Sequence, residues 1–446
     1  MAQTVLVNAG ARLDRLPLSA FHRRIFALVA AGMFFDGYDL YVGATVLGST
    51  VKSGFSTLAQ NAQFVSLTFF GMTLGSFIAG FLGDRYGRRF TYQFNLMIFG
   101  VASLAAAFAP DMAVLNALRF VMGLGLGAEI VVGYSTLTEF VPPRTRGRWL
   151  AFLAMIVVSG LPATALLGTL TIPVFGWRPM FVICGIGALI VWYLRKRMPE
   201  SPRWLESQGR ADDAEALVRA IELEAMAGAP LAPLVPSLPA PVRPLGDLFR
   251  APLLARLIVG SIVLIVVNTL IFGFVTWLPT FFVRQGLTIA QSFGYTLVIV
   301  LGSPIGCAIG AFSADALGRR RTILAASAAT VLFGAIYPFV AEPALLLSVG
   351  FLLIVAIYVQ VAVLFGVYTP ELFPTEIRLR AVGLCNTLGR AATIVSPFVV
   401  VWLFGRYGVG GVLGLMIGLV LVQVIAVAGW GVEPAGRRLE EIGEPG

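Results

Sequence analysis

The chain has 446 residues, of which 58% are hydrophobic and 12% are charged, and its mean hydropathy is +0.88. A soluble globular domain carries about 25% charged residues, so this composition excludes a water-soluble fold and indicates a membrane protein. The formal net charge of +9 is explained by membrane topology and by attraction to anionic lipid. We therefore expect a lipid bilayer as partner and no nucleic acid.

Apolar stretches long enough to cross the bilayer recur along the whole sequence. Crossing ~30 Å of hydrocarbon takes about 20 helical residues, and backbone polar groups in lipid must be paired within the segment. The sequence therefore predicts an all-α membrane protein of twelve transmembrane helices, six in each half. The predicted helices cover residues 26–48, 61–82, 91–109, 113–137, 149–170, 177–194, 256–282, 291–313, 322–340, 343–369, 383–404 and 409–430.

These helices divide the chain into five predicted parts. Residues 1–25 and 431–446 are cytoplasmic terminal segments, and residues 26–194 and 256–430 are two six-helix bundles. Residues 195–255 form a cytoplasmic linker with an amphipathic helix and a proline-rich spacer. Proline-rich segments are semi-rigid, so the linker is expected to let the two bundles move against each other.

The basic residues predict the orientation of the chain in the membrane. If the N-terminus is inside and residues at the helix ends are counted with the adjoining segments, 26 of the 32 lysines and arginines lie on cytoplasmic segments, 4 lie outside and 2 lie deep within predicted helices. Loops rich in lysine and arginine stay in the cytoplasm. We therefore predict a protein of the cell (inner) membrane with both termini in the cytoplasm.

Two markers occur in both halves of the sequence with nearly the same spacing. Asp84 and Asp315 occupy matching positions of one loop pattern, and Glu139 and Glu371 occupy matching positions of a second pattern. The separation along the chain is almost identical for the two pairs. Such spacing indicates a duplicated half, which is typical of transporters built from two repeats. The two bundles are therefore predicted to be pseudo-symmetric.

The loops that carry these markers are predicted to form a cytoplasmic gate. Charged side chains at the membrane face can pair between neighbouring helices and exchange partners on opening, and Glu139 with Arg148 and Glu371 with Arg380 are candidate pairs. The alternative is that these charges only anchor the loops among lipid headgroups. The predicted gate comprises Gly80, Asp84, Arg85, Gly87, Arg88, Glu139, Arg148, Asp315, Arg319, Glu371 and Arg380.

Apart from tyrosine and cysteine, four ionisable residues lie deep within the predicted helices of the first half: Asp36, Asp39, Arg119 and Glu129. A charge at bilayer depth costs at least ~2.5 kcal/mol and usually faces a cavity. Asp39 and Arg119 lie at similar depths, about 13 and 9 Å from the outer helix ends. Because the only histidine, His22, precedes the first helix, we expect Asp36 or Asp39 to bind a coupling proton and to exchange Arg119 as partner. The alternative is a static Asp–Arg pair that only locks the bundle.

Apart from tyrosine and cysteine, Arg390 is the ionisable residue deep within the predicted helices of the second half, where no acid accompanies it. A forked guanidinium suits a substrate carboxylate; the alternative is that the side chain extends across about 10 Å to the headgroups. Aromatic and amide side chains around a central cavity are further candidates for binding substrate. These are Tyr38, Tyr134, Asn268, Trp277, Tyr358, Gln360 and Asn386.

Cys184, Cys307 and Cys385 all lie in apolar stretches without the spacing of metal ligands, so we interpret them as core residues. The sequence shows no nucleophile–base pair, no metal-ligand set and no nucleotide loop. We therefore predict that the protein is not an enzyme and that it needs no cofactor, the proton being its coupling ion.

Several of these segments resemble the major facilitator superfamily, and the resemblance spans nearly the whole chain. The pattern around Asp84 and Arg88 is similar to the family's motif between helices two and three, and Arg119-x3-Gly123-x-Gly125 is similar to its fourth-helix motif. The segment from Pro199 to Trp204 resembles sugar porters. Asp36-Gly37-Tyr38-Asp39 resembles an element of aromatic-acid and other metabolite:proton symporters, whereas the fifth helix lacks the pattern of drug antiporters.

This resemblance implies a monomeric secondary transporter that works by alternating access. The leading interpretation is proton-coupled uptake of a small organic anion, such as an aromatic or aliphatic carboxylate. The alternative is a symporter or facilitator for a sugar or another neutral solute. A non-transporting receptor is the third possibility, but it would need long outer loops, and the predicted outer connections are short.

Overall fold

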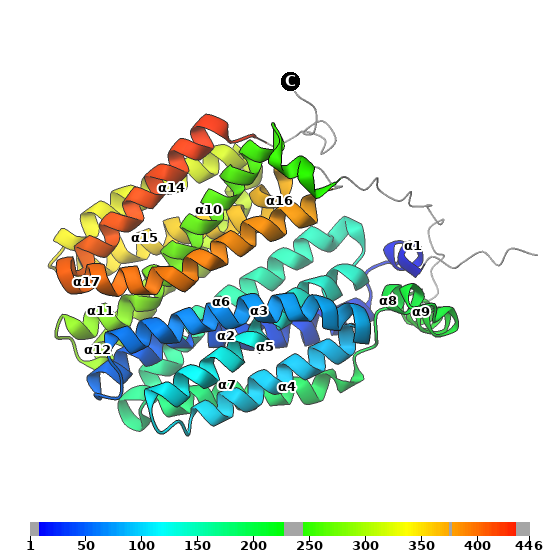
Figure 1. The fold of residues 1–446 in the computed structure, drawn as a ribbon, viewed down its shortest axis with the longest axis horizontal. Coiled ribbons are helices and arrows are strands. Elements are labelled where there is room, and N and C mark those ends of the chain that lie inside the picture. Colours follow the sequence, from blue (N-terminus) through cyan, green and yellow to red (C-terminus); the bar gives the residue numbers. More distant parts are fainter. Residues whose placement is uncertain (1–8, 227–243, 374–376, 434–446) are drawn as a thin grey trace, which may run out of the picture.

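The computed structural model describes residues 9–226, 244–373 and 377–433, and within these ranges it contains helices and no strand. Two groups of long helices lie side by side (Figure 1). We call α2–α7 the N-terminal half and α10–α17 the C-terminal half. The predicted all-helical fold with two six-helix bundles is confirmed, while the proline-rich spacer and most of the predicted C-terminal segment lie outside the described residues.

Six helices of the N-terminal half each account for one predicted crossing. Proline or glycine residues stand at several of their ends, because these residues interrupt the helical hydrogen-bond ladder or adopt a positive φ. The helices are α2 (Ala20–Lys52), α3 (Leu58–Tyr86), α4 (Arg88–Ala106), α5 (Met112–Phe140), α6 (Pro143–Phe175) and α7 (Arg178–Leu194).

The C-terminal half makes six crossings from interrupted helices. One crossing combines α10 (Leu253–Gly273), η3 (Val275–Trp277) and α11 (Leu278–Arg284), and the next combines α12 (Ile289–Val300) with α13 (Gly302–Leu317). The last two crossings belong to α17 (Arg378–Trp430), which turns back at Gly408, where φ is 65°. The remaining elements are α14 (Arg319–Ile336), η4 (Tyr337–Phe339), α15 (Pro343–Val363), η5 (Leu364–Tyr368) and α16 (Thr369–Glu371).

Equivalent helix caps show that the two halves repeat one another. The Thr57 hydroxyl accepts a hydrogen bond from the Gln60 amide at the start of α3, and the Thr288 hydroxyl accepts one from the Gln291 amide at the start of α12, both at 3.2 Å. Each glutamine side chain accepts the threonine amide in return, which completes a capping box. The two caps have the same separation along the chain as the two aspartates of the repeated loop, so the predicted pseudo-symmetry extends to local structure.

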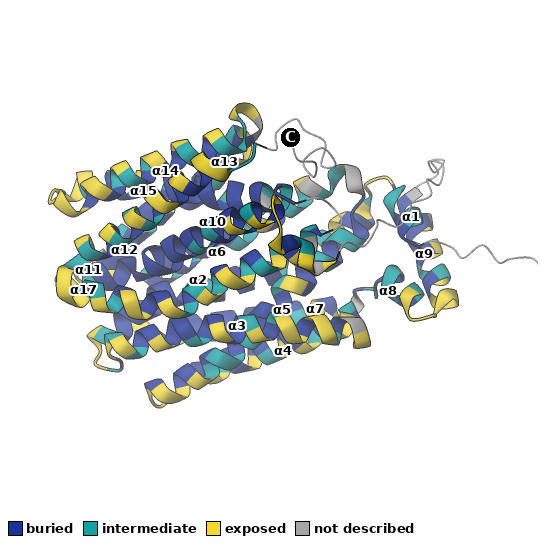
Figure 2. Cartoon of the chain, turned by 45° about the horizontal axis from the view of Figure 1, so that its top comes forward, coloured by how far each residue is buried: buried dark blue, intermediate teal, exposed yellow. Residues whose placement is uncertain are grey.

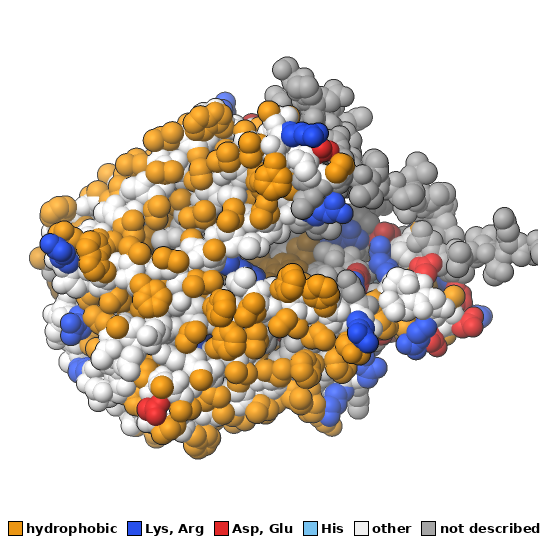
Figure 3. All heavy atoms as spheres, in the orientation of Figure 1, with side chains coloured by type: hydrophobic (Ala, Val, Ile, Leu, Met, Phe, Trp, Pro, Cys, Tyr) orange, Lys and Arg blue, Asp and Glu red, His pale blue; other side chains and the backbone are white. Residues whose placement is uncertain are grey.

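The surface of the helical body is apolar, as a bilayer requires. Phe77, Phe312 and Trp402 are more than half exposed, and hydrophobic side chains cover the visible face (Figure 3). Buried residues line the sides of helices that face other helices (Figure 2). An exposed apolar surface of this extent fits contact with lipid, so the chain is an integral membrane protein.

Three short helices gather at one end of the molecule, which we call the linker end; the opposite end is the far end. They are α1 (Ala9–Asp14), α8 (Pro202–Ser207) and α9 (Ala211–Met226) (Figure 1). The Arg12 Nε donates to Glu222 Oε1 at 2.9 Å, and the Arg15 Nη2 donates to the same oxygen at 2.9 Å. Arg203 Nη2 donates to Asp14 Oδ1 at 2.7 Å. These ion pairs hold α1 against the linker helices.

The contact between α1 and α9 is expected to weaken in acid. The hydrogen bond from Arg12 holds the pKa of Glu222 below its usual value, so this interaction is complete above the usual glutamate pKa of about 4.3. It is lost as the pH falls through the lowered value. Hydrogen exchange of residues 9–14, corrected for the intrinsic rate, should show protection that disappears below about pH 4.

The Glu222→Gln variant should expose residues 9–14 to exchange at neutral pH as well. Glu224→Gln is the matched control, because Glu224 pairs with Arg24 at 3.0 Å on the exposed surface of the same helix. Protection that is equal in all three proteins across the pH range would contradict this role of Glu222.

The two halves touch each other mainly away from the linker end. The Tyr41 and Tyr358 hydroxyls are 3.4 Å apart, and the rings of Phe69 and Phe272 have centroids 4.3 Å apart. A Cβ atom on Gly48, near the far end of α2, would lie 3.4 Å from the Thr280 nitrogen of α11. Figure 3 shows a hollow between the halves on the side toward the linker helices. The structure is therefore closed at the far end and hollowed toward the linker end.

Candidate functional site

Asp39 of α2 and Arg119 of α5 form an ion pair in the interior of the N-terminal half. Both side chains are buried, and the Arg119 Nη2 also donates to the Asp39 carbonyl oxygen at 2.8 Å. Its Nε donates to the Thr68 hydroxyl at 2.8 Å, and its Cζ lies 4.8 Å from the centre of the Phe64 ring. A buried ion pair is tolerated when its remaining donors are occupied, and this guanidinium is held on all three nitrogens.

Asp36 lies one helical turn before Asp39 and has a different environment. It is 2% exposed, and neither carboxylate oxygen has a hydrogen-bond partner among the described residues. Glu129, Arg195 and Asp39 are the charged groups that interact with it electrostatically. Asp36 is therefore a buried acid without a donor of its own, beside an acid and a guanidinium on other helices.

Glu129 of α5 forms an ion pair with Arg195, a residue that the sequence analysis did not select. Arg195 begins η1 (Arg195–Arg197) directly after α7, and its guanidinium is buried. The Nε donates to the Leu28 carbonyl at 2.8 Å and the Nη2 to the Val29 carbonyl at 2.9 Å. Arg195 is the first residue of the predicted cytoplasmic linker, and its long side chain extends from the helix end back into the bundle.

Room for this guanidinium is made by Gly32 of α2. A Cβ atom at Gly32 would overlap the Arg195 guanidinium. Gly32→Ala is therefore expected to displace Arg195 from Glu129 and to lower the free energy of unfolding by about 1–3 kcal/mol, the usual cost of overpacking. Thermal unfolding in detergent would measure the change. Gly414→Ala is the control, because that helical glycine has open space at its Cβ position, and equal losses in both variants would contradict this packing role.

Arg390 of α17 extends from the C-terminal half to α3 of the N-terminal half. Its Nη1 donates to the Ser76 hydroxyl and, at 3.4 Å, to the Met72 carbonyl. Among the described residues Arg390 has no carboxylate partner, and its side chain is half-buried. The guanidinium thus lies between the halves with neutral partners, and its contact with α3 does not favour the alternative in which it extends to the headgroups.

Five other predicted substrate residues have varied surroundings. Asn268 donates to the Leu264 carbonyl at 2.7 Å, and Asn386 to the Val382 carbonyl at 3.0 Å, so both amides bind their own helices. Trp277 is buried and its Nε1 has no hydrogen-bond partner within the described ranges, and Tyr134 is half-buried. Tyr358 meets Tyr41 across the two halves. Tyr41 lies two residues after Asp39, and its aromatic side chain in the first helix is a signal that could have selected it.

Two predicted substrate residues, Tyr38 and Gln360, form their hydrogen bonds inside one half each, and their role in substrate binding stays a prediction. The Tyr38 hydroxyl donates to the Met180 carbonyl of α7 at 3.3 Å, inside the N-terminal half. Gln360 donates to the Thr330 hydroxyl at 2.8 Å and accepts from Gln423 at 2.6 Å, inside the C-terminal half. The rotation of each helix about its axis decides which face meets the centre, and sequence position does not reveal it.

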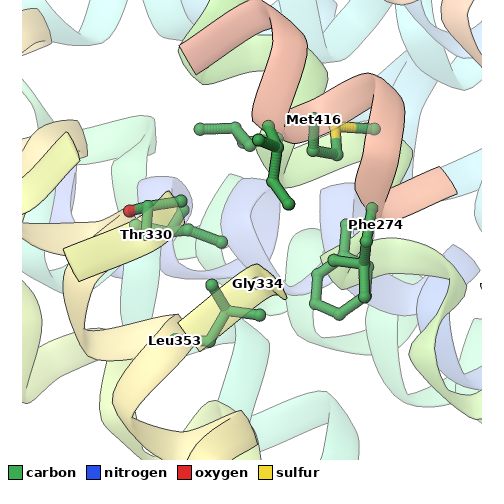
Figure 4. A pocket seen from close by; sticks show the side chains of 9 residues that line it. Phe274, Thr330, Gly334, Leu353 and Met416 are labelled. Carbon is green, nitrogen blue, oxygen red and sulfur yellow. The ribbon is translucent and has the colours of Figure 1, made fainter. Parts of the chain in front are cut away.

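A small apolar pocket lies close to this amide network, also inside the C-terminal half. Phe274, Thr330, Gly334, Leu353 and Met416 surround it (Figure 4). Its volume of about 10 Å³ corresponds to a single water molecule at most. The pocket is therefore part of the packing of this half and holds no metabolite.

The predicted gate forms two equivalent ion pairs with partners other than those expected. The Arg88 Nε donates to Glu139 at 3.0 Å, and the Arg319 Nε donates to Glu371 at 3.0 Å. These ion pairs join α4 to α5 and α14 to α16. The pairings of Glu139 with Arg148 and of Glu371 with Arg380 stay predictions.

The other predicted gate residues fall into three groups. Arg148 and Arg380 are exposed, and the Arg148 Cζ lies 5.6 Å from the Phe152 ring centre. Gly87 has φ 91°, a conformation that favours glycine, whereas Gly80 has open space at its Cβ position and Arg85 is exposed. The side chains of Asp84 and Asp315 lie outside the described part of the structure.

A third pair of equivalent residues caps the helices that follow these loops. The Arg88 amide donates to Glu200 Oε1 at 2.9 Å at the start of α4, and the Arg319 amide donates to Glu433 Oε1 at 3.0 Å at the start of α14. Carboxylates stabilise helix N-termini. The separation of the two glutamates along the chain nearly equals that of the other repeated markers, and this spacing is the sequence signal that could have identified Glu433.

Two repeated six-helix halves, with ionisable groups buried in one half and an arginine between the halves, define a membrane transporter of the two-repeat kind. Residues 29–397 match the Major Facilitator Superfamily. The chain belongs to this family of transporters and is therefore not an enzyme.

Similar proteins agree with this assignment. The chain is 37% identical to the inner membrane metabolite transport protein YdjE of Escherichia coli, over 98% of each protein. It is 33% identical to the niacin transporter NiaP of Acinetobacter baylyi, over 97% of this chain and 99% of that protein. The inward-open, partially occluded xylose transporter XylE of E. coli shares the fold, with a TM-score of 0.73 and 16% identity over 94% of this chain and 100% of that one.

Proposed function

We propose that this transporter imports a small organic anion, with a carboxylate as the recognised group, together with protons. In this proposal the linker end faces the cytoplasm of an inner membrane, both termini are cytoplasmic, and a single chain contains the complete pathway. The hollow on the side of the linker helices then corresponds to a state open to the cytoplasm, and closure of the far end corresponds to a blocked outer entrance.

Arg390 is the observation that carries the anion proposal. Its guanidinium lies between the halves, donates only to a hydroxyl and a carbonyl among the described residues, and retains free donor positions. An uncompensated cation in this position attracts an anion, and the fork matches a carboxylate bidentately. Binding there would also draw the two halves together, because Arg390 already contacts α3 through Ser76.

The relatives favour a carboxylate over a sugar. The relative from Acinetobacter is named for niacin, and niacin is an aromatic carboxylate. The likeness to the xylose transporter, at 16% identity, supports the fold alone. A sugar nevertheless remains the second candidate, because the segment from Pro199 to Trp204 resembles sugar porters and its Glu200 caps α4.

Proton coupling is proposed for the buried acids of the N-terminal half. Asp36, Asp39 and Glu129 are each at most 2% exposed, and Arg119 and Arg195 are the guanidinium groups beside them. Since the described interior of this half contains no histidine at that depth, a proton that crosses with the substrate has carboxylates as its carriers.

Proteoliposomes with a trapped pH indicator provide the test. The medium is made more acidic than the vesicle interior. Nicotinate, benzoate, short aliphatic carboxylates, xylose and glucose are then added one at a time to separate samples. We expect an alkaline-to-acid change inside the vesicles with at least one carboxylate and none with the sugars. Proton movement with a sugar alone would establish the neutral-solute alternative, and solute movement without protons would contradict symport.

A further inference from the structure

We infer that Asp36, Glu129 and Arg195 together bind a single coupling proton, whereas Asp39 and Arg119 form a neutral pair that stays ionised throughout transport. This inference rests on the proposed proton-coupled function and assigns the proton to one of the two buried clusters. It also adds Arg195, at the end of α7, to the coupling machinery.

The charges of the two clusters differ by one unit. Asp39 and Arg119 cancel each other, and each nitrogen of Arg119 already has an acceptor. Asp36 and Glu129 share one cation, Arg195, so this cluster carries one negative charge when both acids are ionised. A net charge is costly inside a membrane protein, and one proton removes it.

The hydrogen-bond pattern supports the same assignment. Neither oxygen of Asp36 has a donor among the described residues, and Glu129 Oε2 also lacks one, although all three atoms are buried. A buried carboxylate without donors is far less stable than its protonated form. A hydronium ion from the aqueous phase transfers its proton to one carboxylate oxygen, which gives a neutral acid and water, while the second carboxylate remains paired with Arg195.

The groups that face Asp36 from the neighbouring elements do not supply another counter-charge within the described ranges. Glu129 projects from α5 and Arg195 from the end of α7, and Asp39 follows on α2 itself. Tyr92 of α4 packs over the Arg195 guanidinium, with its ring centre 4.2 Å from Cζ. Cys184 of α7 is close to Asp39, with Sγ 3.8 Å from Oδ1, and Val157 and Gly160 of α6, which pack against Gly37, carry no charge.

The same charge count suggests how the proton and the substrate are coupled. The N-terminal half has one surplus acid, and Arg390 is the cation of the C-terminal half that lies at the interface. One proton and one monovalent anion neutralise both groups together. Arg256 is also buried, but it lies in the first turn of α10 at the linker end and donates to the Leu372 carbonyl at 3.4 Å. A monocarboxylate is thus expected to cross with one proton and without net charge.

Infrared difference spectroscopy of the purified full-length protein tests the proton site without any substrate. Wild type should show the carbonyl band of one protonated, non-hydrogen-bonded carboxylic acid near neutral pH. Asp36→Asn and Glu129→Gln should each remove this band, because each leaves a neutral pair with Arg195. Asp39→Asn/Arg119→Gln, which removes a neutral pair, and the control Glu222→Gln should keep it.

A charge-restoring double variant separates a proton site from a merely structural cluster. Glu129→Gln/Arg195→Gln leaves Asp36 as the last ionisable group of the cluster, without a cation beside it. Asp36 should then bind the proton, so the band lost in Glu129→Gln should return. A role limited to holding α5 and α7 together would make the double variant no better than the single one. Size-exclusion profiles show which variants are folded. Solute counterflow, which needs no proton gradient, shows which of them still bind and move solute.

The outcomes distinguish this inference from the proposed function. Retention of the band in both Asp36→Asn and Glu129→Gln, or its loss in Asp39→Asn/Arg119→Gln, overturns the inference whatever the transport result. Loss of the band in Asp36→Asn and Glu129→Gln, with its retention in Asp39→Asn/Arg119→Gln, supports the inference. If this pattern is found while no solute of the panel moves protons, the proton site stands and the proposed symport is overturned.

Discussion

Replacement of Arg390 by glutamine is expected to reduce carboxylate uptake by proteoliposomes roughly 30-fold or more. Loss of a charged partner in a desolvated contact costs about 2–5 kcal/mol, and each 1.4 kcal/mol corresponds to a factor of about 10. Arg390→Lys should fall between glutamine and wild type, because lysine retains the charge but lacks the planar fork. Initial rates of labelled nicotinate or benzoate uptake measure both variants.

Arg406→Gln is the matched control for Arg390, because Arg406 lies on the same helix and is exposed, with its Cζ 5.8 Å from the Tyr407 ring centre. Its uptake should equal that of wild type. The two variants should also give equal yields and unfolding temperatures, since the lost Arg390 contacts are hydrogen bonds to one hydroxyl and one carbonyl. Carboxylate uptake that survives Arg390→Gln would remove this residue from the anion site.

Arg119→Gln is expected to destabilise the protein by about 3–5 kcal/mol, because it leaves Asp39 as a buried charge without its partner. Adding Asp39→Asn should recover most of this loss, since two neutral amides replace the ion pair. Denaturant or thermal unfolding in detergent micelles measures the free energies of the single and double variants. The comparison gives the coupling between the two residues directly.

Arg284→Gln serves as the control for this second experiment, because Arg284 is exposed at the end of α11. It should change the free energy of unfolding by less than about 0.5 kcal/mol, as surface substitutions usually do. If Arg119→Gln and Arg284→Gln were equally stable, the Asp39–Arg119 pair would not hold α2 and α5 together. A double variant that is no more stable than Arg119→Gln would contradict the charge argument.

Some of the site could be predicted because membrane burial makes charged residues conspicuous. Asp39 and Arg119 were selected as ionisable residues at similar depths in two apolar stretches, and the structure brings them together. Arg390 was selected for the same reason, and it lies between the halves. In each case a charge in lipid is costly, so a charged residue in an apolar stretch is expected to face a partner or a cavity. A single residue therefore predicts a contact between helices.

Other parts of the site depend on how helices rotate and approach one another. Tyr38 is next to Asp39 in sequence, yet its hydroxyl binds α7 inside the bundle. Arg195 follows the last apolar residue of its helix, yet it is buried against Glu129. A difference of one position changes the direction of a helical side chain by about 100°. A small error in the assumed rotation of a helix therefore changes which of its residues are predicted to face the centre.

The sequence by itself determined that this protein lies in a lipid bilayer, how many times the chain crosses it, and that its two halves are repeats. Hydropathy and repeat spacing are properties of the chain alone. Only the tertiary structure decided which charges are partners. Arg88 could have served as partner to several acids, and the packing of α4 against α5 selected Glu139. Ion pairs form between side chains that folding brings within about 3 Å, and that proximity is set by the packing of whole helices rather than by separation along the chain.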